Sequence, residues 1–338
     1  MKQLARLATA LLIAAALCAA AGCDDEEPDE AVKPAALAYP VLYSADSPFN
    51  QPIAGDAAID PDSDLLIESI IEQAESQGFF IAVNEWTIPI YYADADTPRY
   101  DVALTASWAP ARVMLDVPIP DYAEPDPAGD GHMVIIDNAT GCEYDLWVAR
   151  KGISDSWSAS WGNAISHDGN GIFPTGLSAR GSGFALPAGM LWPGELAAGE
   201  ITHALVFSYD HTKAGGPVAP ATESDGTSLR DDAIPEGARI QLDPDLDLSA
   251  LGLTDYELTI AKALQRYGMF LGDDGGGVQL QAVSPLSVQG NPYDGILPDD
   301  DTVLLDNIPV ERFRVLKLPP QEPDIEVTLS ESDCAQME

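Results

Sequence analysis

The chain has 338 residues, of which 46% are hydrophobic, a proportion typical of a globular protein rather than of a disordered one. It carries 55 acidic and 16 basic residues, which gives a formal net charge of −39 at pH 7. A field of this sign repels phosphate backbones and anionic lipid, so we expect no nucleic acid partner.

An export signal is predicted over residues 1–22. Two basic residues precede an apolar run that is shorter than the roughly 20 apolar residues of a membrane span. The sequence Ala20-Ala21-Gly22-Cys23 is similar to a lipobox, which implies cleavage before Cys23 and a lipid on that cysteine. An ordinary cleaved signal is the alternative. We therefore expect a lipoprotein of the bacterial cell envelope, on its periplasmic or extracellular face, that touches the membrane only through its anchor.

Three segments are predicted after the signal: a lipid-anchored acidic linker at 23–40, a β-rich domain at 41–320 and a C-terminal tail at 321–338. The linker is rich in acidic residues, proline and alanine, a composition typical of a flexible tether. Cys142 and Cys334 follow the anchor cysteine. In an oxidising compartment they are able to pair and to tie the tail to the middle of the chain, and the sequence leaves that pairing open.

Helical spacing of apolar residues predicts one helix up to Gln77 and a second at 254–267. Short β-branched and aromatic segments predict strands at 79–83, 87–92, 102–105, 132–137, 143–148, 201–209, 238–242, 269–271, 278–283 and 314–316. The turn Asn138-Ala139-Thr140-Gly141 makes the clearest hairpin. Residues 150–195 lack periodicity and predict a long ordered loop region, which is usually functional.

Many strands, two principal helices and no strand–helix–strand rhythm predict a mainly β fold. We expect a single β-sandwich or jelly-roll-like domain with long loops.

Four segments carry a family resemblance: Ser47-Pro48-Phe49-Asn50, residues 130–134, residues 199–205 and residues 263–269. In this order they resemble an uncharacterised family of secreted bacterial proteins of the actinomycete type. The resemblance covers roughly residues 45–317 and implies one exported domain. It implies no reaction, so the site hypotheses rest on residue chemistry.

The first site hypothesis is a polysaccharide lyase. His132 and His203 fall on predicted strands, Tyr267 and Asp273 bracket a predicted helix-to-strand turn, and Arg239 begins a strand. If neighbouring strands brought them together, a histidine would act as the base, Tyr267 as the acid and Arg239 as the clamp for a uronate carboxylate. The alternative is that these side chains have no catalytic role and only complete the core. The net charge also counts against a polyanionic substrate, unless salt screens the repulsion.

The second hypothesis is a glycoside hydrolase that uses two carboxylates from among Glu85, Asp168 and Glu195. The third is a glycan-binding or structural surface lipoprotein without catalysis. Trp86 and Trp161 are candidates for stacking on sugar rings and Asp168 for binding a sugar hydroxyl, although the tryptophans could equally fill the core.

No cofactor is predicted from motifs, because zinc-ligand spacing, an EF-hand loop, a phosphate-binding loop and GxSxG are all missing from the sequence. A structural Ca²⁺ at Asp126 and Asp130, or at Asp273 and Asp274, is left open. The substrate, the question of catalysis, the membrane that holds the anchor and the oligomeric state are not fixed by the sequence.

Overall fold

The computed structural model describes residues 33–37, 42–323, 328–329 and 332–338. The predicted export signal, the lipidation site at Cys23 and most of the predicted linker lie outside these residues. Within the described part of the chain, no helix is long and apolar enough to cross a membrane.

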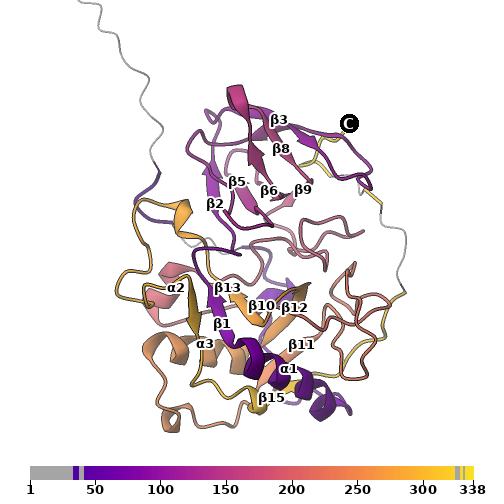
Figure 1. Cartoon of the computed structure of the whole chain (residues 1–338), viewed down its shortest axis with the longest axis vertical. Coiled ribbons are helices and arrows are strands. Elements are labelled where there is room, and N and C mark those ends of the chain that lie inside the picture. Colours follow the sequence, from indigo (N-terminus) through magenta and orange to yellow (C-terminus); the bar gives the residue numbers. More distant parts are fainter. Residues whose placement is uncertain (1–32, 38–41, 324–327, 330–331) are drawn as a thin grey trace, which may run out of the picture. The chain divides into compact units, whose positions relative to one another are not determined.

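The described residues are mainly β, as predicted, with 15 strands in three sheets and three α-helices. The largest sheet is built from β1 (Phe79–Ala82), β10 (Leu205–Tyr209), β11 (Arg239–Leu242), β12 (Met269–Asp274), β13 (Val278–Gln281), β14 (Thr302–Leu304) and β15 (Phe313–Val315). Its strand order is β14-β1-β13-β10-β12-β11-β15 (Figure 1).

Two four-stranded sheets complete the fold. One contains β2 (Ile90–Ala93), β5 (Met133–Asp137), β6 (Cys142–Trp147) and β9 (Trp161–Ser166), in that order. The other contains β3 (Arg99–Leu104), β4 (Val113–Pro118), β7 (Arg150–Lys151) and β8 (Trp157–Ala159), in the order β4-β3-β8-β7. Side chains of both sheets, among them Tyr91 and Ile135 from one and Val102 and Trp157 from the other, share one apolar core. These two sheets therefore form a β-sandwich.

The β5–β6 hairpin confirms the prediction made from its turn, with Asp137 paired to Cys142 at the closed end. Four strand pairs are parallel, however: β1 with β13, β10 with β12, β2 with β5, and β3 with β8. A parallel pair needs a crossover connection. Between β2 and β5 this crossover runs through β3 and β4 of the other sheet rather than through a helix. That is why the sequence shows no alternation of strands and helices.

The prediction of a long loop region at 150–195 is partly wrong, because β7, β8 and β9 lie within it and the short helix α2 (Pro193–Ala198) begins in it. Trp157 and Ala159 are buried, while Ser158 between them is half-buried. Serine, glycine and asparagine weaken the strand pattern in this stretch, and cross-strand partners such as Val102, opposite Trp157, supply the pairing that propensity does not.

The two longer helices are α1 (Ser63–Gln77) and α3 (Asp255–Arg266), and both lie beside the seven-stranded sheet (Figure 1). Thr254 starts α3 with a capping box, in which its hydroxyl accepts from Glu257 N and the Glu257 carboxylate accepts from Thr254 N. Apolar residues of both helices join a core with alternate residues of the sheet, including Leu205 and Phe207 of β10.

The intervening residues of the same strands face a second core. Val206 of β10 and Phe270 of β12 pack there with Ile90 of β2 and Val134 of β5. Phe49 lies between Phe184 and Phe270, with ring centres 5.1 Å and 5.5 Å from theirs. The seven-stranded sheet is thus covered by apolar packing on both faces, and the second core joins it to the β2–β5–β6–β9 sheet.

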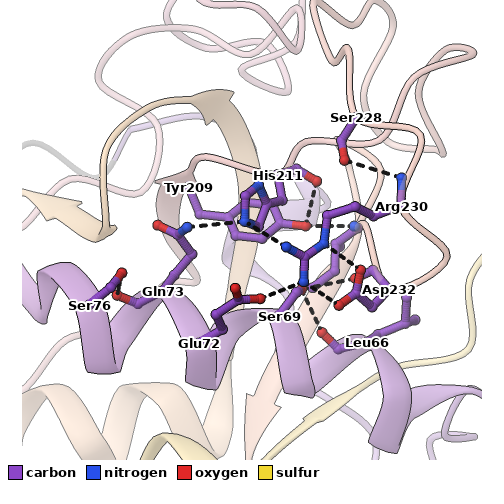
Figure 2. Close-up of polar contacts among 11 residues, drawn as sticks. Leu66, Ser69, Glu72, Gln73, Ser76, Tyr209, His211, Ser228, Arg230 and Asp232 are labelled. Carbon is purple, nitrogen blue, oxygen red and sulfur yellow. Dashed lines mark hydrogen bonds and ion pairs between the residues drawn. The ribbon is translucent and has the colours of Figure 1, made fainter.

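A polar network fixes the long segment after β10 to α1 (Figure 2). Arg230 binds Asp232 through Nε at 2.8 Å and Nη2 at 2.7 Å, and it also contacts Glu72 of α1. His211 Nε2 lies 3.2 Å from both the Arg230 guanidinium and the Gln73 amide nitrogen. Because both neighbours are N–H donors, Nε2 accepts and the ring proton sits on Nδ1. This anchoring positions the part of the segment that lines the cavity described below.

The disulfide between Cys142 and Cys334, which the sequence left open, is present, with the two Cα atoms 5.4 Å apart. It connects the first residue of β6 to the C-terminal tail. Cys142 is buried against the core between the four-stranded sheets, and Cys334 packs at its edge.

Candidate functional site

A cavity of about 910 Å³ is lined by residues of the seven-stranded sheet, of the β2–β5–β6–β9 sheet and of several loop segments. The end of β12 contributes Asp273, and the approach to β5 contributes Asp130 and His132. Residues 174–181 and 217–225 supply the loop walls. The cavity therefore gathers side chains from distant parts of the sequence, the tail residues Glu322, Pro323 and Thr328 among them.

One wall of the cavity is aromatic. Trp161 is fully buried, and its indole Nε1 donates to Leu177 O at 2.6 Å. Trp147 Nε1 donates to Asp130 Oδ1 at 3.3 Å. Trp108 is 56% exposed, and its ring centre lies 5.6 Å from that of Trp161. The ring of Trp108 thus packs beside Trp161 and is largely exposed at the cavity.

Another wall is acidic. Asp225, Glu236 and Asp273 each place one carboxylate oxygen within 4.8 Å of the other two, and we call these three residues the acidic triad. Asp225 is exposed, Asp273 is half-buried, and Glu236 is 0% exposed. Glu223 and Asp274 line the cavity beside them.

Crowding and burial keep protons on these acids. Burial, followed by the charge of Asp225, raises the pKa of Asp273 to about 8. Burial raises the pKa of Glu223 to about 7, although its oxygens accept from Leu177 N at 2.7 Å and Ser178 N at 3.3 Å. Burial and then the charge of Asp225 also raise the pKa of Glu236 well above its ordinary value. The cavity therefore holds carboxyl groups that are partly neutral near pH 7.

Arg180 is the one lysine or arginine among the described residues that line this cavity. It is 3% exposed, and its guanidinium donates to Ala188 O at 3.1 Å, Leu186 O at 3.0 Å and Gln281 Oε1 at 2.9 Å. Burial lowers its pKa, while the charges of Asp273 and Asp145 oppose that shift. The donors of Arg180 are thus directed at carbonyl groups, and in the described part of the chain it forms no ion pair within 4 Å.

Two glycines allow residues 222–225 to pack closely against residues 181–183 in the wall of the cavity. A Cβ on Gly181 would lie 2.7 Å from Asp225 Cγ, and one on Gly183 would lie 2.1 Å from Thr222 Oγ1. Gly183 also has φ of +80°, a conformation that side chains disfavour. The sequence Gly181-Ser182-Gly183 therefore serves the close approach of the 222–225 loop and not a nucleophile turn.

His132 lines the cavity, as the lyase hypothesis requires, together with Asp273 and Trp161. It is 6% exposed, and burial lowers its pKa to about 4. The ring is therefore neutral at pH 7.

His203 is not brought to His132, and this part of the prediction is wrong. The two precede strands of different sheets, β10 and β5, rather than neighbouring strands of one sheet. His203 Nε2 lies 3.1 Å from Glu195 Oε2, and Nδ1 lies 2.9 Å from Ala204 O. The Glu195 carboxylate, proposed above for a hydrolase, is thus part of a buried pair away from the cavity.

Tyr267 and Arg239 also lie elsewhere and do not form the predicted acid and anion clamp on the cavity. Arg239 donates from Nε to Tyr267 O at 2.8 Å and from Nη2 to Gln51 O at 2.6 Å. Its guanidinium lies 4.8 Å from the centre of the Phe270 ring. Tyr267 is 5% exposed and packs in the second core. Both residues connect chain segments.

Trp86 and Asp168 do not line the cavity. Trp86 is 50% exposed, with a backbone oxygen that accepts from Gln279 Nε2 at 3.0 Å. Asp168 pairs with His167 at 3.2 Å on the surface. Of the sugar-contact candidates, Trp161 alone lies on the cavity.

The calcium sites left open by the sequence are not formed as such. Asp126 accepts from Thr87 N, Trp86 N and Ala128 N, so its carboxylate closes a turn. Asp273 clusters with Asp225 and Glu236 rather than with Asp274.

Sequence reasoning missed Arg180, Asp225 and Glu236. A signal for Arg180 existed, since an arginine between small residues stands out in a chain with only 16 basic residues. Asp225 and Glu236 had no such signal among 55 acidic residues. Their meeting with Asp273 depends on the fold.

No family model, no curated protein and no solved structure matches this chain. The resemblance to secreted bacterial proteins therefore stays a prediction.

Proposed function

We propose that the protein is a cell-envelope lipoprotein that binds a neutral or positively charged extracellular carbohydrate in this cavity. The observation that carries the proposal is that one cavity of about 910 Å³ has both an aromatic wall and an acidic wall. Trp108 offers an exposed aromatic ring to the C–H side of a sugar ring, with Trp161 packed behind it, and Asp130, Glu223 and Asp225 offer acceptors to the hydroxyl or amino groups of the sugar.

The charge of the cavity selects among carbohydrates. Six acidic residues, Asp130, Glu223, Asp225, Asp273, Asp274 and Glu322, line it together with Arg180. This balance disfavours a uronate and favours a neutral or amino sugar. The lyase version of the proposal has less support than binding, because Arg239 and Tyr267 lie elsewhere.

Hydrolysis is a second candidate, favoured by the state of Asp273. Its pKa of about 8 keeps the carboxyl protonated at pH 7, as a general acid requires. Asp225, with an oxygen within 4.8 Å, would be the partner at a spacing closer to that of retaining than of inverting enzymes. The expected products are new reducing ends, and Asp273→Asn should abolish them while leaving binding in place.

A glycan array probed with the full chain tests binding, with neutral, amino and uronic acid sugars compared at 0.15 M salt. Binding should appear on neutral or amino sugars. Trp108→Ala should weaken it about tenfold, equivalent to about 1.4 kcal/mol. Trp86→Ala is the matched control, since Trp86 is similarly exposed but outside the cavity. Equal losses in both variants, or binding to uronic acids alone, would contradict the proposal.

A further inference from the structure

We infer that Asp225, Glu236 and Asp273 together hold one divalent cation of the Ca²⁺ type at the acidic wall of the cavity. Ca²⁺ binds oxygen ligands at about 2.4 Å, so a single ion can bridge oxygens up to about 4.8 Å apart. The three carboxylates meet this condition pairwise. All three donors are hard oxygens, which suit Ca²⁺ or Mg²⁺ better than Zn²⁺.

Glu236 supplies an observation beyond the clustering of acids. Its side chain is completely buried, and Oε2 accepts from Asp225 N at 3.1 Å. Oε1 is also buried and has no hydrogen-bond partner in the described part of the chain, and the Ser224 side chain, which acts to lower the pKa of Glu236, does not offset the effect of burial. A buried carboxylate oxygen without a donor carries its full desolvation cost. A cation among the triad would satisfy it.

Arg180 is the counter-charge that acts on the triad, lowering the pKa of Asp273, but it forms no ion pair with any of the three carboxylates. The N–H groups of Arg180 donate to backbone carbonyls and to Gln281. Asp225, Glu236 and Asp273 form no ion pair with any described residue. Glu223 and Asp274, on the same cavity, add to the negative field. Such a field concentrates cations at this wall.

The triad is also reachable. Asp225 and Asp273 line the cavity, with Asp225 exposed and Glu236 behind them. Ca²⁺ takes six to eight oxygen ligands, so three carboxylates leave positions open. Those positions face the cavity, where vicinal hydroxyls of a sugar could fill them, a step that rests on the proposed function.

The test is calorimetric titration of CaCl₂, and separately MgCl₂, into the full chain after removal of metal with a chelator, at pH 7.5 and 0.15 M NaCl. We expect one Ca²⁺ per chain and weaker Mg²⁺ binding, because Mg²⁺ demands octahedral geometry. Asp225→Asn and Asp273→Asn should each weaken Ca²⁺ binding at least about tenfold, or about 1.4 kcal/mol. Asp274→Asn is the matched control: it removes one charge from the same cavity without removing a ligand.

Glu236→Gln is the more direct test of the buried ligand, but a substitution at this buried position could prevent folding, so circular dichroism is measured on the same variant. If Glu236→Gln does not fold, the result for the exposed Asp225→Asn decides whether the triad binds calcium. Tb³⁺ luminescence excited through tryptophan gives a second readout of the same site. No calcium heat and no Tb³⁺ signal at millimolar metal would overturn the inference, as would equal losses in Asp225→Asn and Asp274→Asn. Calcium binding without any glycan binding would leave the cation site standing and refute the proposed function alone. Reducing ends formed by a calcium-free chain, with Asp273→Asn inactive and with no calcium heat in the titration, would assign Asp273 to acid catalysis and overturn the cation site.

Discussion

Replacing Arg180 with methionine tests how the cavity is built. The guanidinium donates to Ala188 O, Leu186 O and Gln281 Oε1 at 2.9–3.1 Å and to Ala185 O at 3.4 Å. Methionine fills much of the volume but donates nothing. At about 1 kcal/mol for each acceptor left without a donor, the substitution should lower the free energy of unfolding by about 3–4 kcal/mol. This part of the loss does not depend on pH.

A second part of the loss does depend on pH. Arg180 lowers the pKa of Asp145 and of Asp273, which burial raises to about 7 and about 8. A carboxyl whose folded pKa is raised costs stability as pH rises from its unfolded pKa through its folded pKa. Without Arg180 both folded pKa values rise further, so the added cost is absent at pH 5, where both groups are protonated, and present at pH 8.5. One further pKa unit is equivalent to about 1.4 kcal/mol.

Urea unfolding followed by tryptophan fluorescence at pH 5 and pH 8.5 measures both parts. Arg180→Met should lose about 1–2 kcal/mol more at pH 8.5 than at pH 5. Arg180→Lys keeps the charge and loses the forked donors, so its loss should change little with pH. Arg112→Met, at an exposed arginine, is the control and should cost under about 1 kcal/mol. A loss from Arg180→Met that is the same at both pH values would refute the electrostatic reasoning, and a loss below about 1 kcal/mol would refute the role of the donors.

Three further outcomes are expected. Cys334→Ser opens a loop with a sequence separation of 192 residues to Cys142 and should cost about 2–5 kcal/mol, seen as a lower melting temperature that reductant no longer changes. Burial alone lowers the pKa of His203, but the Glu195 carboxylate outweighs burial and the pKa in the folded protein is raised. The pair therefore stabilises the fold fully at pH values below the pKa of an unfolded histidine, and this stabilisation is lost as pH rises through the pKa of His203 in the folded protein. Glu195→Gln should therefore destabilise most in acid, measured as melting temperature against pH. Thr254→Ala removes a helix cap and should cost about 1 kcal/mol in the same thermal assay.

Much of the secondary structure followed from local signals. The β5–β6 hairpin depends on its own turn and on two adjacent segments, and α3 on a capping box and an apolar stripe. The parallel pairs could not be predicted in this way. β10 meets β12 only after the chain has formed β11 and α3, so the pairing is set by tertiary packing.

The candidate site shows the same limit more sharply. His132 and Asp273 were identified because one is a scarce residue type and the other follows a helix-to-strand turn, and both line the cavity. His203 was assigned by alternation along a strand, a rule that gives the face within one sheet but not which sheet lies opposite. Glu236 could not be singled out at all, because its complete burial beside Asp225 and Asp273 depends on the tertiary fold.

The acidity of the chain has two physical meanings. A surface carboxylate keeps its hydration, so a strongly acidic surface is explained by solubility or by a saline habitat and requires no ligand. Glu236 has lost its hydration, its Oε1 has no partner among the described residues, and two further carboxylates lie within 4.8 Å. Adaptation to a saline habitat does not explain this arrangement. Salt in the solvent does not reach the buried Glu236 directly, so it does not offset the desolvation of that carboxylate. A proton shared among the three carboxylates, or a bound cation, is needed to offset the desolvation of Glu236. The two differ in pH dependence. A shared proton is lost as pH rises through about 8, whereas cation binding becomes stronger over the same range. Calcium affinity measured from pH 6 to pH 9 should therefore rise with pH if the triad is a cation site.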